Sequence, residues 1–238
     1  MYQENIFITS NDVDNHYDLK ISSLFKYLQQ VSTNHTEKIG LGKKDTVDKG
    51  MFWVITRMKV ITYKMPKMLE TIKVTTHPGN ILMFVFPRFY EVYSEEGELL
   101  VAASSSWALL DIDTHKAIMK PNVDYSLYIG EKLDEDISLP EKVSFDNLEK
   151  IEERKVRYSD IDLNGHLNNT KYIEYIVDTH DINFYQNKRI KEIVINYERE
   201  IKDGDVVSLY SDHQEEEVIV GDVNDKHSFM AKVIYESR

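Results

Sequence analysis

The chain has 238 residues, 42% of them hydrophobic and 29% charged, so it is long enough to bury a core and its composition excludes wholesale disorder. It contains no cysteine, which excludes disulfides, thiolate nucleophiles and cysteine-ligated metal sites and fits a reducing, cytoplasmic setting. The net charge of −12 argues against nucleic acid as a partner, because phosphate binding needs a basic surface.

The first 111 residues predict one helix and five strands. Ile6 and Ile8 alternate with polar residues, as in a half-buried strand. Apolar residues then recur at helical spacing from an N-cap at Ser22 or Ser23 as far as Ile39. Four longer strands rich in β-branched and aromatic residues follow the helix, at residues 51–63, 71–77, 81–93 and 99–111.

Regular alternation is lost after Pro121. The next thirty or so positions contain Pro140 and the acidic run 131–136, and they read as a long connection between two domains. The domain organisation that we predict is a first domain at residues 1–130, a linker at 131–150 and a second domain at 151–238.

The second part of the chain repeats the pattern of the first. A short strand at 151–158 precedes a helix that Asn168 caps, and four further strands follow, at 190–201, 206–213, 217–223 and 229–235. The buried side of this helix is predicted to consist of Tyr172, Ile173, Tyr175, Ile176 and Ile182. A single helix covers a long antiparallel sheet best when the sheet curls around it. The predicted fold class is therefore α+β, with two tandem hotdog domains that each curl an antiparallel sheet around one long helix.

One short segment, residues 159–169, gathers polar side chains between a predicted strand and the start of the second helix. The first backbone N–H groups of a helix lack intrahelical partners and carry a partial positive charge. A carbonyl placed there would find its developing oxyanion stabilised, and a carboxylate such as that of Asp162 could activate water or attack directly. The segment is therefore a candidate site for acyl-transfer chemistry.

Two metal sites compete with this interpretation of the segment. Asp160, Asp162, Asn164 and Gly165 fill the first half of an EF-hand calcium loop, but its last ligand position falls on Lys171, and a strand rather than a helix precedes it. A zinc site would need cysteines or a second clustered histidine, and the segment has neither. We therefore predict no metal and no other cofactor.

A purely structural role is the other alternative, since an Asx-rich turn can serve only to cap the helix that follows it. Asn168 fits that role. Capping alone does not require Asp162 and His166 in the same turn, so it accounts for only part of the segment.

The segment matches the Asp-x-Asn-x-His-x-Asn-Asn signature of the acyl-acyl-carrier-protein thioesterases of plants and bacteria, at Asp162, Asn164, His166, Asn168 and Asn169. The chain resembles these double-hotdog enzymes in its first part too, at residues 28–30, 34–35, 53–58 and 103–107. Single-hotdog thioesterases share the Gly-His-x-Asn-Asn core but lack the first-part matches. The resemblance implies an enzyme that hydrolyses the thioester of a fatty acyl-acyl carrier protein and releases free fatty acid.

The resemblance also implies a set of catalytic residues, namely Asp162, Asn164, His166 and Glu200. Asp162 would act as general base for water or as nucleophile, and Asn164 with nearby backbone N–H groups would bind the oxyanion. His166 would polarise the carbonyl or shuttle a proton. Glu200, in the predicted strand 190–201 that follows the second helix, would orient the water or tune His166. Plant members carry a cysteine after this acidic residue, but here Ile201 stands in its place, so a cysteine nucleophile is impossible.

The first domain contains a weak echo of the loop at Asp12-Val13-Asp14-Asn15-His16. Aligned on its histidine, the echo is two residues shorter and lacks the glycine and the Asn-Asn pair, so we interpret it as a degenerate copy without catalytic work. In the family the first hotdog lines the acyl tunnel instead. The apolar candidates for that lining are Leu28, Val31, Phe52, Trp53, Phe84 and Phe86.

The implied partner, acyl carrier protein, is strongly acidic. Residues 131–238 carry a net charge of −11 and residues 1–130 one of −1, so the carrier is predicted to dock on the first domain. The candidate cations for docking are Lys43, Lys44, Lys59, Lys64, Lys67 and Arg88.

Other functions stay open at this stage. An acyl-CoA thioesterase would use the same chemistry on a different carrier, and a non-catalytic acyl-binding protein would use the same fold. Retention of all four candidate catalytic residues argues against the second. No apolar run approaches the ~20 residues of a membrane span, and the first residues do not resemble a signal peptide. The chain is predicted to be cytoplasmic, and its fold allows a homodimer.

Overall fold

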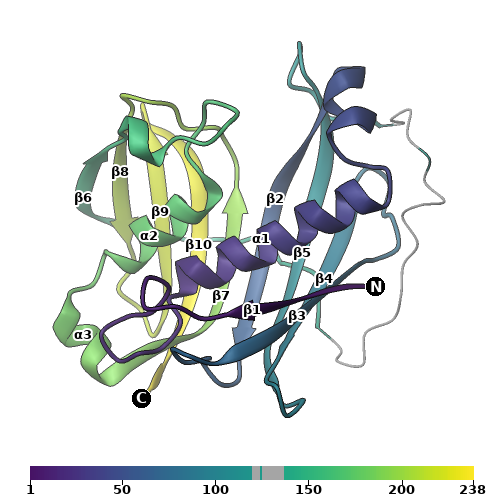
Figure 1. Cartoon of the computed structure of the whole chain (residues 1–238). Coiled ribbons are helices and arrows are strands. Elements are labelled where there is room, and N and C mark those ends of the chain that lie inside the picture. The colour runs from purple at the N-terminus through teal and green to yellow at the C-terminus, as the bar shows by residue number, and fades with distance from the viewer. Residues whose placement is uncertain (120–123, 125–136) are drawn as a thin grey trace. The chain divides into compact units, whose positions relative to one another are not determined.

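The computed structural model describes residues 1–119, 124 and 137–238. These residues form two compact units, Met1–Pro140 and Glu141–Arg238, each of which contains antiparallel strands and its own helices (Figure 1). Part of the predicted linker, residues 131–136, lies outside the described residues. Residues 141–148 belong to the second unit, where the buried side chain of Val143 packs against Val194 and Val218.

The first unit has five antiparallel strands and one long helix in its described residues. The order of these strands is β1-β3-β4-β5-β2. In chain order its elements are β1 (Tyr2–Phe7), α1 (Ile21–Lys38), the 3₁₀ turns η1 (Lys43–Asp45) and η2 (Val47–Lys49), β2 (Met51–Thr62), β3 (Thr71–Pro78), β4 (Phe86–Tyr93) and β5 (Leu99–Asp111).

Helix α1 lies along one face of this sheet because its apolar positions recur every three or four residues (Figure 1). Its buried residues are Ile21, Leu24, Phe25, Leu28, Val31, Ser32 and His35. The predicted N-cap was wrong: the helix begins at Ile21, and Lys20 precedes it without a side-chain cap. The predicted strand 81–93 begins only at Phe86, because Leu82 and Val85 bond each other's backbone across a turn in which Met83 has a positive φ of 58°.

The second unit has the same order of strands, β6-β8-β9-β10-β7, so each strand has a counterpart in the first unit. This repetition confirms the predicted fold class. Its elements are β6 (Glu149–Lys155), the 3₁₀ turn η4 (Tyr158–Asp160), α2 (Asn169–Val177), α3 (Ile182–Asn187), β7 (Lys188–Tyr197), β8 (Val206–Ser211), β9 (Glu216–Val223) and β10 (Lys226–Ser237).

Two sequence-based expectations for the second unit were wrong. Its helical segment is divided into α2 and α3, and Ile182 is 60% exposed at the start of α3 rather than buried beside Tyr172. Strand β7 ends at Tyr197 instead of residue 201, because the N–H groups of Glu198 and Arg199 both donate to the carbonyl of Ser228. Glu200 therefore follows the strand rather than lying in it.

The core beneath α2 depends on the absence of a side chain at Gly221. The fully buried ring of Phe229 lies over this residue and packs edge-on against Tyr172, at 5.3 Å between ring centroids. A Cβ at position 221 would lie 2.0 Å from Cε1 of Phe229. The ring would have to move, and with it the support of α2.

Gly221→Ala is therefore expected to lower the free energy of unfolding by about 1–3 kcal/mol, the usual cost of overpacking a core. Chemical denaturation checks the value. In a Phe229→Leu background the same substitution should cost less, since the smaller side chain makes room. An equal cost in both backgrounds would exclude the ring as the cause.

Candidate active site

The segment singled out in the sequence forms a tight loop between η4 and α2. The N–H of Asp162 donates to the carbonyl of His166 at 2.8 Å, and the N–H of Gly165 returns to the carbonyl of Asp162 at 3.1 Å. Gly165 has a φ of +82°, a conformation that glycine adopts without strain. Leu163, at the tip of the loop, is 96% exposed. The loop is thus held by its own backbone.

The carboxylate of Asp162 is fixed by the loop that carries it. Its Oδ1 accepts hydrogen bonds from the N–H of Asn164 at 2.8 Å and from the N–H of His166 at 3.2 Å. Both bonds fix the orientation of the carboxylate within the loop. They use Oδ1 alone, which leaves Oδ2 outside these bonds.

His166 and Glu200 form the second polar contact of the site. The Nε2 atom of His166 lies 3.0 Å from Oε2 of Glu200, and their side chains are 20% and 33% exposed. Leu167 donates its N–H to the carbonyl of Ile201 at 2.8 Å, and His166 pairs with Lys202 in a β-bridge, so the segment after β7 is attached to the loop. A carboxylate bonded to one ring nitrogen fixes the orientation of an imidazole.

The structure therefore brings three of the four predicted residues together. Asp162 and His166 are linked through the loop backbone, and Glu200 contacts the imidazole. Asn164 supplies a backbone N–H to Asp162, whereas the residue itself is exposed. Its predicted role in binding an oxyanion stays a prediction.

Tyr172, in the first turn of α2, is a residue of the site that the sequence interpretation assigned only to the core. It is buried, and the pKa of its phenol is raised, first by burial and also by the negative charges of Asp162 and Glu200, against a backbone hydrogen bond from Ile201. The phenol is therefore protonated at neutral pH beside both carboxylates. The signature did continue through Tyr172, but its aromatic character alone indicated packing.

The start of α2 is capped as predicted. The side chain of Asn168 accepts a hydrogen bond from the N–H of Thr170 at 3.0 Å. The two oxygens of Asp160 are engaged by the N–H of Arg157 at 3.0 Å and, at 3.9 Å, by Lys171. Within the described ranges, no group of three or more His, Asp or Glu side chains is arranged to hold a metal ion.

Glu200→Gln is expected to lower kcat by about ten- to a hundredfold, the usual effect of losing the partner that orients a functional imidazole. Thermal unfolding should be unchanged, because both side chains are partly exposed. Steady-state kinetics on a fatty-acyl thioester measures the effect, and Glu198→Gln, on the same segment, is the matched control. Normal turnover in Glu200→Gln would show that Glu200 is a surface residue without a role in catalysis.

The echo in the first unit has the same backbone hydrogen bonds as the candidate site. The N–H of Asp14 donates to the carbonyl of Asp18 at 2.8 Å, and the N–H of Tyr17 donates to the carbonyl of Asp14 at 3.1 Å. Oδ1 of Asp14 accepts from the N–H groups of His16 at 2.8 Å and Asp18 at 3.1 Å. The interpretation of the echo as a shorter loop was therefore wrong: the two loops have the same length.

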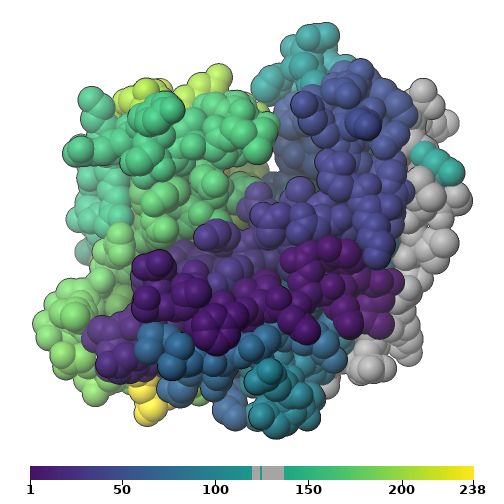
Figure 2. Space-filling model, in the orientation of Figure 1, coloured from purple at the N-terminus to yellow at the C-terminus, as the bar shows by residue number. Residues whose placement is uncertain are grey.

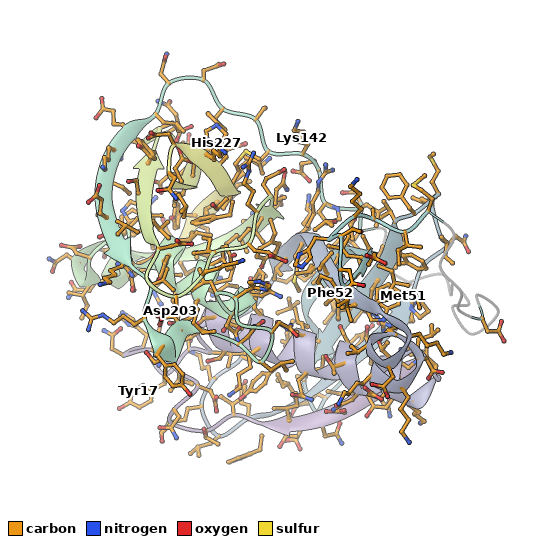
Figure 3. All side chains as sticks on the ribbon, turned by 90° about the horizontal axis from the view of Figure 1, so that it is seen from above. Tyr17, Met51, Phe52, Lys142, Asp203 and His227 are labelled. Carbon is orange, nitrogen blue, oxygen red and sulfur yellow. The ribbon has the colours of Figure 1, made fainter. Side chains whose placement is uncertain are left out.

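The register of these bonds shows which residues correspond. His16 lies where the candidate site has Asn164, and Asp18 lies where it has His166. Tyr17, which projects from the periphery of the first unit (Figure 3), takes the place of Gly165 and shares its positive φ, at 63°. Lys67 lies 2.7 Å from the buried Asp18, so an ion pair occupies the position of the imidazole.

The candidate cations for carrier docking lie in different surroundings. Arg88 is only 3% exposed, and its guanidinium contacts Nδ1 of His35 at 2.9 Å. Lys67 is held by Asp18, and Lys64 lies 2.7 Å from Glu98. Arg88 was therefore wrong as a surface candidate, while Lys43 and Lys44 are exposed on η1.

The apolar candidates for the acyl tunnel fall into different environments. Leu28 and Val31 lie on the buried side of α1, and Phe86 packs edge-on against Trp53 at 4.9 Å between ring centroids. The indole of Trp53 donates to the carbonyl of Leu41 at 3.0 Å. Phe52 is next to Met51 at the start of β2 (Figure 3), and neighbouring residues on a strand point to opposite faces. In the view of Figure 2, the purple and dark blue residues of β1, α1 and the turns after it form most of the visible surface of the first unit.

Comparison with known proteins gives matches over both units. The family model described as the acyl-ACP thioesterase N-terminal domain matches residues 1–123, and the model described as the C-terminal domain matches residues 144–232. A chloroplastic palmitoyl-acyl carrier protein thioesterase of Arabidopsis thaliana is 25% identical over 214 residues, which are 84% of this chain and 52% of the relative. The chain spans about half the length of such curated relatives.

Solved structures match the chain over nearly its full length. An acyl-ACP thioesterase of Bacteroides thetaiotaomicron is 26% identical, with a TM-score of 0.92 over 98% of this chain and 97% of that one. The 12:0-ACP thioesterase of Umbellularia californica has a TM-score of 0.86 at 19% identity, over 100% and 97% of the two chains, a likeness of fold. No helix in the described part of this chain is long and apolar enough to span a membrane.

Proposed function

Since the chain belongs to the acyl-ACP thioesterase family, we propose that it hydrolyses the thioester of a fatty acyl-acyl carrier protein and releases the free fatty acid. The observation that carries the proposal is the geometry of the loop before α2. It holds the Asp162 carboxylate by two N–H bonds and, four residues later, an imidazole that contacts Glu200 at 3.0 Å.

In the proposed reaction a water molecule attacks the carbonyl carbon of the thioester. Asp162 takes a proton from this water as the C–O bond forms, which is the role of a general base. The carbonyl oxygen becomes an oxyanion, for which the backbone N–H groups before α2 and the amide of Asn164 are the proposed donors.

Collapse of this intermediate restores the carbonyl and breaks the C–S bond. The sulfur leaves as a thiol on the carrier, with its proton supplied through His166. Glu200 keeps the imidazole oriented toward the reacting atoms. Because the chain has no cysteine, no thioester to the enzyme can form.

The two units have different tasks in the proposal. The first, with boundaries near residues 1–130, holds the acyl chain among its apolar side chains, and the second, residues 151–238, carries the chemistry. The ion pair of Asp18 with Lys67 at the position of the imidazole supports this division. The acidic carrier docks on the less acidic first unit, where the exposed Lys43 and Lys44 lie outside the ion pairs that hold Lys64 and Lys67.

The test of carrier identity is a comparison of kcat/KM for one acyl chain on acyl carrier protein and on coenzyme A. We expect the higher value with the carrier protein. A higher value with coenzyme A would replace the proposal with an acyl-CoA thioesterase of the same chemistry. The cytoplasmic location, which the lack of cysteine supports, is checked by cell fractionation, and the homodimer by light scattering.

A further inference from the structure

The hydroxyl of Tyr197 is buried and has no hydrogen-bond partner among the residues that the structure describes. Burying a hydroxyl without a partner is unfavourable, and most buried polar groups in proteins are bonded. Other tyrosines of this chain follow that rule. Tyr90 bonds Ser32 at 2.6 Å, and Tyr185 donates to the carbonyl of Val177 at 2.9 Å.

Tyr197 lies at the candidate site. It is the last residue of β7, and the four residues after it form the segment that carries Glu200 to His166. Its ring packs edge-on against Tyr172 with 5.2 Å between ring centroids. Tyr172 in turn receives a backbone hydrogen bond from Ile201 and feels the charges of Asp162 and Glu200.

The phenol of Tyr197 is a neutral donor at physiological pH. Burial raises its pKa, and the neighbouring hydroxyl of Tyr172 raises it further. A buried phenol that keeps its proton can donate one hydrogen bond to an oxygen atom, and it adds no charge to a site that already holds two carboxylates.

We propose that the Tyr197 hydroxyl donates a hydrogen bond to the carbonyl oxygen of the bound thioester. This rests on the proposed hydrolase function and adds a catalytic residue to it. The bond strengthens as negative charge develops on that oxygen, so Tyr197 stabilises the transition state more than the bound substrate. The hydroxyl is unpaired in the free protein because its partner arrives with the substrate.

The test is Tyr197→Phe, which removes only the oxygen atom. We expect kcat to fall at least about tenfold, the equivalent of one hydrogen bond of ordinary strength, with KM little changed. The loss should be equal on an acyl-carrier substrate and on a small acyl thioester without a carrier. The melting temperature should stay the same or rise, because the variant no longer buries an unpaired hydroxyl.

The matched control is Tyr185→Phe, in the same unit and outside the site. Its hydroxyl is bonded, so this variant should lower the melting temperature and keep kcat. The two variants therefore separate stability from activity. If Tyr197→Phe keeps normal kcat on both substrates, the hydroxyl binds only an ordered water and the proposal is overturned.

A rise in KM confined to the carrier substrate would also overturn the proposal, since the hydroxyl would then contact the carrier arm. A wild-type chain that cleaves small thioesters but no acyl-carrier protein would refute the proposed carrier while the Tyr197 test stands. The two failures are therefore distinguishable.

Discussion

Asp162→Asn is expected to lower kcat by at least about a hundredfold, the lower range for loss of a general base. The amide oxygen of asparagine can still accept the N–H groups of Asn164 and His166, so the loop should keep its conformation. The amide cannot take a proton from water. Steady-state kinetics gives the loss, and the melting temperature should match that of the wild type.

The chain supplies its own control for this variant. Asp14 accepts the same pair of backbone N–H bonds in the first-unit loop, from His16 and Asp18. Asp14→Asn should therefore reproduce any effect of the substitution on loop stability and leave kcat unchanged. If Asp14→Asn and Asp162→Asn were to lower kcat equally, the role of Asp162 would be structural.

His166→Ala is the second variant with a large expected effect, again a loss of at least about a hundredfold in kcat. It removes the proposed proton carrier to the leaving sulfur and the partner of Glu200. The backbone N–H of residue 166 still reaches Asp162, and the side chain is partly exposed, so the fold should survive. Near-normal turnover in this variant would remove His166 from the mechanism.

A double-mutant cycle then separates His166 from Glu200. If Glu200 acts only by orienting the imidazole, Glu200→Gln should change kcat little once His166 is alanine. If the two losses multiply, Glu200 has an independent task, such as orienting the attacking water.

The loop and the helix cap could be predicted from the sequence because both depend on neighbouring residues. Asn168 caps α2, and Asp162, Gly165 and His166 close a turn whose bonds all lie within the loop. The repeated fold could be predicted as well, since alternation and helical spacing recur in the same order in both halves.

Features that depend on distant residues could not be predicted in the same way. Arginine is usually a surface residue, so the sequence predicts an exposed Arg88. Only the contact between α1 and β4 places its guanidinium against His35. The carboxylate of Glu200 reaches His166 because β7 ends at Tyr197, where the next two N–H groups donate to the carbonyl of Ser228. The alternation of residues 190–201 gives no sign of this contact. The sequence assigned Tyr172 only to the core and gave Tyr197 no role, and only the burial of its hydroxyl without a partner singles out Tyr197.

The first-unit echo shows a different limit. Alignment by residue type placed His16 opposite His166, whereas the backbone bonds place Asp18 there and Tyr17 opposite Gly165. The register of a loop is set by its hydrogen bonds. A glycine indicates a turn with positive φ, whereas Tyr17 adopts the same backbone conformation and gives no such signal in the sequence.

The most direct test of the proposed function is release of free fatty acid from a panel of acyl carrier proteins loaded with chains of different lengths. We expect the wild-type chain to release fatty acid from at least one member of the panel. Asp162→Asn should release it at least about a hundredfold more slowly. Absence of release from every member would contradict the proposed function, and release by Asp162→Asn at the wild-type rate would contradict the proposed role of Asp162.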